Sequence, residues 1–183
     1  MRSRAGVGLG SNQGDRAGFL AKAREWLARQ SVAPVRFSRI YETEPVGCPA
    51  GTPSFLNAAA EVVMEGAPSA FLAAMLAFER ECGRDRASGH PEKRTLDLDL
   101  LYWEDWVVNE PGLILPHPRM LGRRFVMEPL ADVCPDRVLP GQTKTVRELR
   151  DLLPPEKSFP WTVEGARCRS VDGILIGRKK AQG

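Results

Sequence analysis

The most regular alternation of hydrophobic and polar positions in this chain covers residues 95–100, where leucines alternate with Thr, Asp and Asp. Successive side chains of a β-strand point to opposite faces, with a rise of roughly 3.3 Å per residue. The pattern therefore predicts a strand with Leu96, Leu98 and Leu100 against a core. Asp97 and Asp99 then stand about 6 to 7 Å apart on the other face. A slip of one residue would bury both carboxylates, so the register is well defined.

The rest of the chain alternates between extended and helical patterns. Period-two alternation and short apolar runs predict strands, whereas apolar residues three or four positions apart predict helices. We expect strands at residues 5–9, 35–41, 55–64 and 113–115, a turn into a short strand at 102–108, and helices at 19–27, 68–79, from 120 and at 146–152. This order is close to β-α-β-β-α-β and predicts a single α+β domain, a mostly antiparallel sheet flanked by helices.

Length and composition narrow the function classes. The chain has 183 residues, 43% of them hydrophobic, which suits one domain with a sizeable core. No apolar run approaches the roughly 18 to 20 residues of a membrane span, and no signal-peptide apolar stretch follows the first residues, so we expect a cytoplasmic protein without a membrane partner. The net charge of +3 is too mild to demand a nucleic acid.

Several common cofactor and metal motifs are missing. The four cysteines are scattered without a C-x-x-C pair, which predicts neither a disulfide framework nor a zinc site. Gly6, Gly8 and Gly10 suggest a dinucleotide fingerprint, but Ser11 stands where its third glycine belongs. The chain also lacks the G-x-x-x-x-G-K-[ST] phosphate loop. A nucleotide would have to be held by other groups.

Arginines near the acidic strand are the alternative phosphate ligands. Phosphate chains need forked cationic donors and divalent cations, and carboxylates such as Asp97 and Asp99 can hold the latter. The basic residues concerned are Arg84, Arg86, Arg94, Arg119, Arg123 and Arg124. His117 lies between two prolines, which makes the backbone rigid, and it could donate to a phosphate oxygen or to a nearby carbonyl. Each arginine could equally be a solvated surface residue, and the acidic strand an ordinary half-buried one.

Phe55 and Asn57 share one face of a predicted strand. The pair offers an aromatic plate and, beside it, an amide with both donor and acceptor groups. A flat heterocycle would fit this arrangement. The alternative is that Phe55 belongs to the core and Asn57 ends a hydrogen-bond ladder.

Taken together, the ordered motifs of residues 6–152 resemble those of the 6-hydroxymethyl-7,8-dihydropterin pyrophosphokinase family of folate synthesis. The segments are GLGSN at 8–12, YETEP at 41–45, FLNA at 55–58, E-x-x-x-G-R-x-R at 79–86, RTLDLD at 94–99, PHPR at 116–119 and R-x-F at 123–125. The resemblance implies a ferredoxin-like fold. It also implies transfer of pyrophosphate from ATP, as co-substrate, to the pterin hydroxymethyl group, with release of AMP.

The resemblance also assigns roles to residues. Asp97 and Asp99 would hold two Mg²⁺ ions, and together with Arg84 and Arg94 they form the expected catalytic group. The expected pterin-binding residues are Thr43, Glu44, Val46, Phe55, Asn57 and Phe125. The expected ATP-binding residues are Glu79, Arg84, Arg86, Arg94, His117 and Arg123. The loop from 84 to 94 would close over the substrates.

Some features depart from the family pattern or lie outside it. Pro91, Glu92 and Lys93 replace the usual Trp-Gly-Pro, so an aromatic that packs over the closed site is missing. We expect a pyrophosphokinase domain at 1–153 and a C-terminal extension at 154–183 with a possible edge strand and a basic tail. We also expect a monomer.

Two alternative functions remain open. One is an RNA-binding module, which the carboxylates of Asp97 and Asp99 disfavour because they would repel phosphate. The other is a catalytically silent relative.

Overall fold

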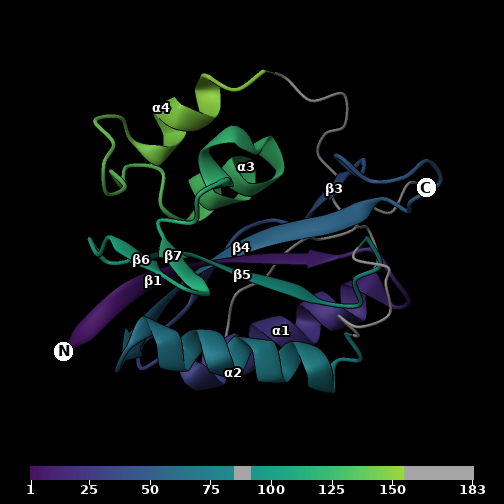
Figure 1. Cartoon of the computed structure of the whole chain (residues 1–183), viewed down its shortest axis with the longest axis horizontal. Coiled ribbons are helices and arrows are strands. Elements are labelled where there is room, and N and C mark those ends of the chain that lie inside the picture. Colours follow the sequence, from purple (N-terminus) through teal and green to yellow (C-terminus); the bar gives the residue numbers. More distant parts are fainter. Residues whose placement is uncertain (85–91, 155–183) are drawn as a thin grey trace, which may run out of the picture.

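In the computed structural model, which describes residues 1–84 and 92–154, five strands of these residues form one antiparallel sheet (Figure 1). They are β1 (Arg2–Ser11), β2 (Arg36–Phe37), β3 (Tyr41–Thr43), β4 (Phe55–Glu65) and β5 (Asp97–Trp103). The order across the sheet is β2-β4-β1-β5, and β3 also pairs with β4. With a helix after β1 and another after β4, this is the predicted ferredoxin-like arrangement.

Two helices, α1 (Arg16–Gln30) and α2 (Pro68–Glu81), cover one face of the sheet (Figure 1). Asp15 caps the first by accepting a hydrogen bond from the Gly18 amide at 2.9 Å. Pro68 opens the second helix, and Gly83, with a φ of +82°, follows its end in the left-handed conformation that glycine adopts most readily. The leucines of the acidic strand point to this side, since Leu96, Leu98 and Leu100 belong to the same apolar cluster as residues of α1 and α2. They are at most 4% exposed, which confirms the predicted core face.

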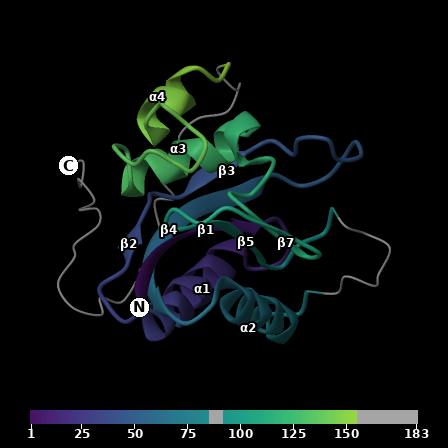
Figure 2. The same ribbon diagram turned by 60° about the vertical axis from the view of Figure 1, so that its left-hand side comes forward.

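The opposite face carries the 3-10 turn η1 (Met120–Gly122) and the helices α3 (Arg124–Val133) and α4 (Val146–Asp151) (Figure 2). A second apolar cluster, containing Met127 and Leu130 of α3, packs there against the sheet. A hairpin of β6 (Val108–Glu110) and β7 (Leu113–Leu115) precedes these helices. Because α3 and α4 lie over this face, the sheet does not present the open surface that an RNA-binding module of this topology uses.

The predicted strand at 35–41 is interrupted in the structure. Its two ends form β2 and β3, but the amide of Arg39 donates to the carboxylate of Asp132 in α3 at 3.2 Å. The Ser38 hydroxyl in turn accepts from the amide of Ala59 at 2.8 Å. Side chains thus replace part of the backbone ladder, which alternation along the sequence could not reveal.

Strand β5 runs through Tyr102 and Trp103, where a turn was expected. The pairing of β5 with β1 shifts by one residue, so that Leu100 lies opposite Val7 and Tyr102 opposite Gly6. Such a bulge inserts one residue and reverses the alternation after it. Leu101 and Tyr102 therefore join the cluster beneath α3, while Trp103 packs on the α1 and α2 side.

Within the described residues, none of the helices has the length and apolar character to cross a membrane.

Candidate active site

The floor of the candidate site is a row of glycines in β1. Gly10 lies between Asp97 of β5 and Asn57 of β4, and Gly8 lies opposite Asp99. Residues directly opposite one another in antiparallel strands point to the same face. Since glycine has no side chain, a hollow forms between the carboxylates on one side and Asn57 on the other. The signal for this floor in the sequence is a glycine at every second position, a pattern that also resembles part of a dinucleotide fingerprint.

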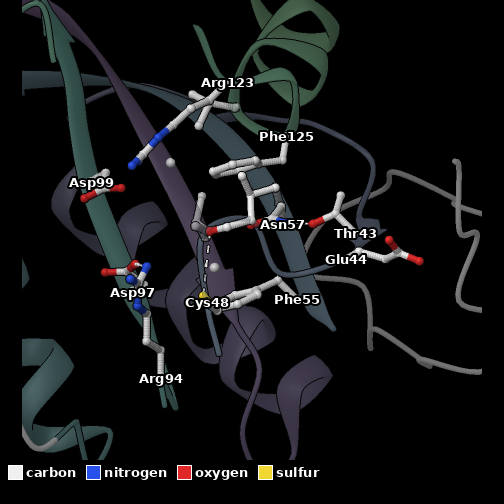
Figure 3. A pocket seen from close by; sticks show the side chains of 16 residues that line it. Thr43, Glu44, Cys48, Phe55, Asn57, Arg94, Asp97, Asp99, Arg123 and Phe125 are labelled. Carbon is white, nitrogen blue, oxygen red and sulfur yellow. Dashed lines mark hydrogen bonds and ion pairs between the residues drawn. The ribbon is translucent and has the colours of Figure 1, made fainter. Parts of the chain in front are cut away.

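Two aromatic rings border one end of this hollow (Figure 3). Phe55 begins β4 and Phe125 lies in the first turn of α3, and Asn57 stands between their rings. The Asn57 amide donates to the Thr43 hydroxyl at 2.7 Å, and both residues are less than 8% exposed. This buried hydrogen bond fixes the plane of the amide in the gap between the rings. A planar heterocycle can stack there and present its edge to Asn57.

Charged groups border the other end. Arg94 donates to the carboxylate of Asp97 at 2.5 Å, and Arg84 donates to the other oxygen of the same carboxylate. The guanidinium of Arg94 lies 5.6 Å from the centre of the Phe55 ring, and that of Arg123 lies 5.5 Å from the centre of the Phe125 ring. Each aromatic plate thus has an arginine beside it, and Figure 3 shows both arginines reaching toward the two aspartates.

Glu79 supports this charged end from beneath the sheet. It belongs to α2, is completely buried, and accepts a hydrogen bond from Arg84 at 2.5 Å. The same oxygen accepts from the backbone amide of Leu98 at 2.7 Å. A buried carboxylate needs such partners, and here they join the helix, Arg84 and the acidic strand.

Asp99 is held in an unfavourable environment for a carboxylate. Burial raises its pKa to about 6, and the nearby negative charge of Asp97 contributes to the rise, whereas Arg94 and Arg123 oppose it. A cation bound at the pair would favour ionised Asp99. Carboxylate oxygens are the ligands that Mg²⁺ prefers in proteins, and Mg²⁺ usually keeps water and substrate phosphate oxygens as its other ligands. In the described ranges there is no group of three or more metal-ligating side chains, so the remaining ligands would come from such molecules.

His117 lies near this charged end in the loop after β7. Its amide donates to the Leu101 carbonyl at 2.7 Å, and its ring Nδ1 accepts from the Arg119 amide at 3.3 Å. Burial lowers the pKa of His117, and the positive charges of Arg123 and Arg119 lower it further. The ring is therefore neutral near pH 7, and the hydrogen bond at Nδ1 leaves the proton on Nε2.

The structure brings most of the predicted site residues together around one pocket. Those that line it are Thr43, Glu44, Val46, Phe55, Asn57, Arg94, Asp97, Asp99, Arg123 and Phe125. The carboxylate of Glu44 points away from the two rings (Figure 3). Arg84, Glu79 and His117 are not part of the lining, although the first contacts Asp97 directly. Arg86 lies outside the described residues.

Besides the glycine floor, our reading of the sequence missed Cys48 as a pocket residue. It belongs to the loop between β3 and β4, where its thiol donates to the Val46 carbonyl at 3.7 Å. A single cysteine in a Pro/Gly-rich loop carries no periodic signal, so no pattern could have placed it here.

Comparison with known proteins identifies the family of this chain. A family model described as 7,8-dihydro-6-hydroxymethylpterin-pyrophosphokinase (HPPK) matches residues 6–135. A 2-amino-4-hydroxy-6-hydroxymethyldihydropteridine pyrophosphokinase of Methylorubrum extorquens is 40% identical over 154 residues, covering 84% of this chain and 95% of the relative. The enzyme of the same name from Porphyromonas gingivalis is 42% identical over 132 residues, covering 70% of this chain and 89% of the relative.

The solved structures extend the likeness to the fold. The crystal structure of Plasmodium falciparum HPPK-DHPS with pteroate matches with a TM-score of 0.62 and 13% identity, over 82% of this chain and 42% of that protein. The α+β fold, with a pocket that joins two aromatic rings to a cluster of arginines and aspartates, suits the class of enzymes that transfer phosphate-containing groups. This chain belongs to the 7,8-dihydro-6-hydroxymethylpterin pyrophosphokinase family.

Proposed function

We propose that this protein transfers the pyrophosphoryl group of ATP to the hydroxymethyl oxygen of 6-hydroxymethyl-7,8-dihydropterin in folate synthesis. The observation that carries the proposal is the composition of one pocket in a member of this family. A slot between two aromatic rings continues directly into a cluster of arginines and paired carboxylates. The first part suits a flat heterocycle and the second a polyphosphate with divalent cations.

The pterin would lie between Phe55 and Phe125, with its edge against Asn57. The hydrogen bond from Asn57 to Thr43 supports this assignment because it orients the amide before a ligand arrives. Thr43, Glu44 and Val46 line the same pocket. Since Glu44 points away from the rings in Figure 3, its contribution would be its backbone rather than its carboxylate.

The triphosphate would lie against Arg84, Arg94 and Arg123. Guanidinium groups bind phosphate oxygens through two parallel donors and keep their charge at any physiological pH. Arg84 and Arg94 each contact Asp97 through Nη1 in this structure. Because a guanidinium has five N–H donors, each could bind a phosphate oxygen while it keeps this carboxylate. His117, neutral and with a hydrogen on Nε2, would be a further donor. Glu79 would act on Arg84 rather than on ATP, since it is fully buried beneath the sheet.

We further propose that Asp97 and Asp99 hold two Mg²⁺ ions. Their all-oxygen donor set and the raised pKa of Asp99 support this assignment. When bound, the ions supply charge neutralisation for the phosphate groups and orientation of the reacting oxygens. We also propose a monomer as the active form.

The reaction follows from positioning. The hydroxymethyl oxygen forms a bond to the β-phosphorus of ATP, the bond from this phosphorus to the oxygen shared with the α-phosphorus breaks, and AMP leaves. The hydroxymethyl proton passes to solvent. The aromatic slot fixes the attacking oxygen, and the arginines stabilise negative charge on the transferred group.

The test is to incubate the protein with ATP, Mg²⁺ and 6-hydroxymethyl-7,8-dihydropterin and to identify the nucleotide by chromatography. We expect AMP and the pterin diphosphate in equal amounts, and no turnover after Mg²⁺ is removed with a chelator. Formation of ADP would contradict pyrophosphoryl transfer. Absence of any pterin-dependent product would favour the catalytically silent relative.

A further inference from the structure

A cluster of side chains behind the pocket joins β3 to α3, and the reaction described above does not use it. The carboxylate of Asp132 accepts hydrogen bonds from the Tyr41 hydroxyl at 2.7 Å, the Arg39 guanidinium at 2.8 and 3.1 Å, and the Arg39 amide at 3.2 Å. Tyr41 is 2% exposed, and the Asp132 side chain is 19% exposed. The cluster thus binds the backbone of the chain entering β3 as well as its side chains.

This cluster is connected through β3 and through α3 to the space between Phe55 and Phe125, which we call the heterocycle slot. In the pairing of β3 with β4, Tyr41 lies opposite Asn57 and Thr43 lies opposite Phe55. Thr43 in turn holds the amide of Asn57. On the helix side, Asp132 lies about two turns after Phe125, so both side chains leave α3 on the same side. The cluster therefore links α3, which carries Phe125, to β3 and its partner β4, which carries Phe55 and Asn57.

Strand β3 needs this second attachment. It has three residues, and it is followed by a loop in which Val46 is 66% exposed. So short a strand gains little stability from its ladder alone. Hydrogen bonds to a carboxylate are among the stronger ones in proteins, and four of them converge here on one partly buried group.

We infer that Asp132 is a positioning residue for the heterocycle slot: by holding Arg39 and Tyr41 against α3 it sets the spacing between Phe125 and the Asn57 edge. This inference rests on the proposed function, because it takes the pterin as the slot's ligand. Asp132 touches neither substrate. Its loss should therefore weaken pterin binding selectively, while the arginines that face ATP keep their positions.

The experiment compares Asp132→Asn and Tyr41→Phe with the wild type. Calorimetry measures the Kd of 6-hydroxymethyl-7,8-dihydropterin in the presence of a non-cleavable ATP analogue, and separately the Kd of that analogue. We expect Asp132→Asn to raise the pterin Kd about tenfold, since small misplacements of binding groups have effects of this size, and to leave the Kd of the analogue within about twofold. Tyr41→Phe, which keeps the ring and loses one bond, should raise the pterin Kd about threefold. Asp136→Asn, an exposed aspartate just after α3, serves as the matched control and should change neither constant.

Three outcomes would overturn the inference. The first is a folded Asp132→Asn protein with wild-type pterin affinity. The second is an equal rise of the Kd values for the pterin and for the ATP analogue, which indicates a general loss of structure. The third applies if Asp132→Asn fails to fold, and it is an unchanged pterin Kd in Tyr41→Phe. Failure of the wild-type protein to bind the pterin at all would instead refute the proposed function.

Discussion

Gly6, Gly8 and Gly10 occupy alternate positions on one face of β1, but the space above them differs. A Cβ at Gly6 would overlap the ring of Tyr102, whereas a Cβ at Gly10 would sit 3.4 Å from the Asn57 oxygen and 3.6 Å from the Cβ of Asp97. Gly6 is thus required for packing against Tyr102. Gly10 keeps the pocket floor open.

This difference predicts separable effects of two alanine substitutions. Gly6→Ala should lower the free energy of unfolding by about 1 to 3 kcal/mol, because it overpacks the core around Tyr102. Gly10→Ala should keep the wild-type stability and raise the KM for the pterin, because its methyl group fills the floor beside Asn57. Urea unfolding and steady-state kinetics on both variants check the prediction. A Gly10→Ala protein with unchanged KM would show that the floor is not part of the substrate site.

The two aspartates should differ when each is changed to asparagine. Asp97 is 12% exposed and pairs with Arg84, which is 11% exposed, so Asp97→Asn should destabilise the protein by about 2 to 4 kcal/mol. Asp99 carries a raised pKa and a repulsive neighbour, so Asp99→Asn should leave the Tm unchanged or raise it. Both should reduce turnover at least about a hundredfold. Thermal unfolding in the presence of a chelator, together with the AMP assay, tests this pair. Equal loss of stability in both variants would contradict the assignment of distinct environments.

At the scale of elements, α3 is attached to the sheet partly through ionised groups, and this attachment depends on pH. Burial tends to raise the pKa of Asp132, but the hydrogen bonds from Arg39 and Tyr41 outweigh it and lower the pKa. A carboxyl group whose pKa is lowered by folding contributes stability above its unfolded pKa, about 3.9, and loses it as the pH falls through the lower folded value.

The corresponding prediction concerns Asp132→Asn. The variant should be less stable than the wild type at pH 7, and the difference should shrink as the pH falls from about 5 to below 3.9, because only the wild type loses this contribution. Urea unfolding at a series of pH values measures the difference. A gap that stays constant down to pH 3 would mean that the Asp132 charge does not stabilise the fold.

Alternation and helical spacing predicted the main elements correctly, because each of them buries one face. The acidic strand, α1 and α2 are examples, and their apolar residues lie where the pattern placed them. The failures occur where a side chain or a β-bulge alters the backbone ladder. Asp132 interrupts the strand at residues 35–41 from a position more than ninety residues away, and the bulge at Leu101 extends β5 past the expected turn. Neither event has a local signature.

The candidate site was predictable for a different reason. Its charged residues lie on either side of one strand, so proximity in the chain indicated proximity in space. The contacts of Glu79 were not predictable, because they depend on how α2 packs under β5. The family resemblance implies an ATP contact for this residue, and in the structure it is buried as a partner of Arg84 and of the Leu98 amide.

At the scale of the whole molecule, the described residues up to Pro154 form two apolar clusters and the pocket. Arg124 donates to the carbonyl of Leu153 at 2.8 Å and to that of Pro154 at 3.4 Å. The residues just after α4 therefore belong to the folded unit. The boundary that we expect at residue 153 stays a prediction, since residues 155–183 are not described.

A chain that ends at Pro154 tests this boundary. We expect it to keep the Tm of the full chain and a turnover number within about twofold of it, because all the contacts of the pocket among the described residues are retained. A chain that ends at residue 150, which loses the two carbonyls bound by Arg124, is the matched control and should be less stable. Loss of activity in the longer of the two would show that residues 155–183 contribute to the enzyme.

The partnering of Arg84 and Arg94 with Asp97 has a consequence for how the site selects its ligand. The formal positive charges near the site belong to Arg84, Arg94, Arg119 and Arg123, and they are matched by the negative charges of Glu44, Glu79, Asp97 and Asp99. His117 adds no charge near pH 7. The described part of the site is therefore close to electrically neutral. A polyphosphate without cations gains no net attraction from a neutral site. A polyphosphate that carries divalent cations has little net charge itself, so the site and its ligand together stay close to neutral. Neutrality of this kind would discriminate between metal-complexed and metal-free nucleotide before any chemistry begins.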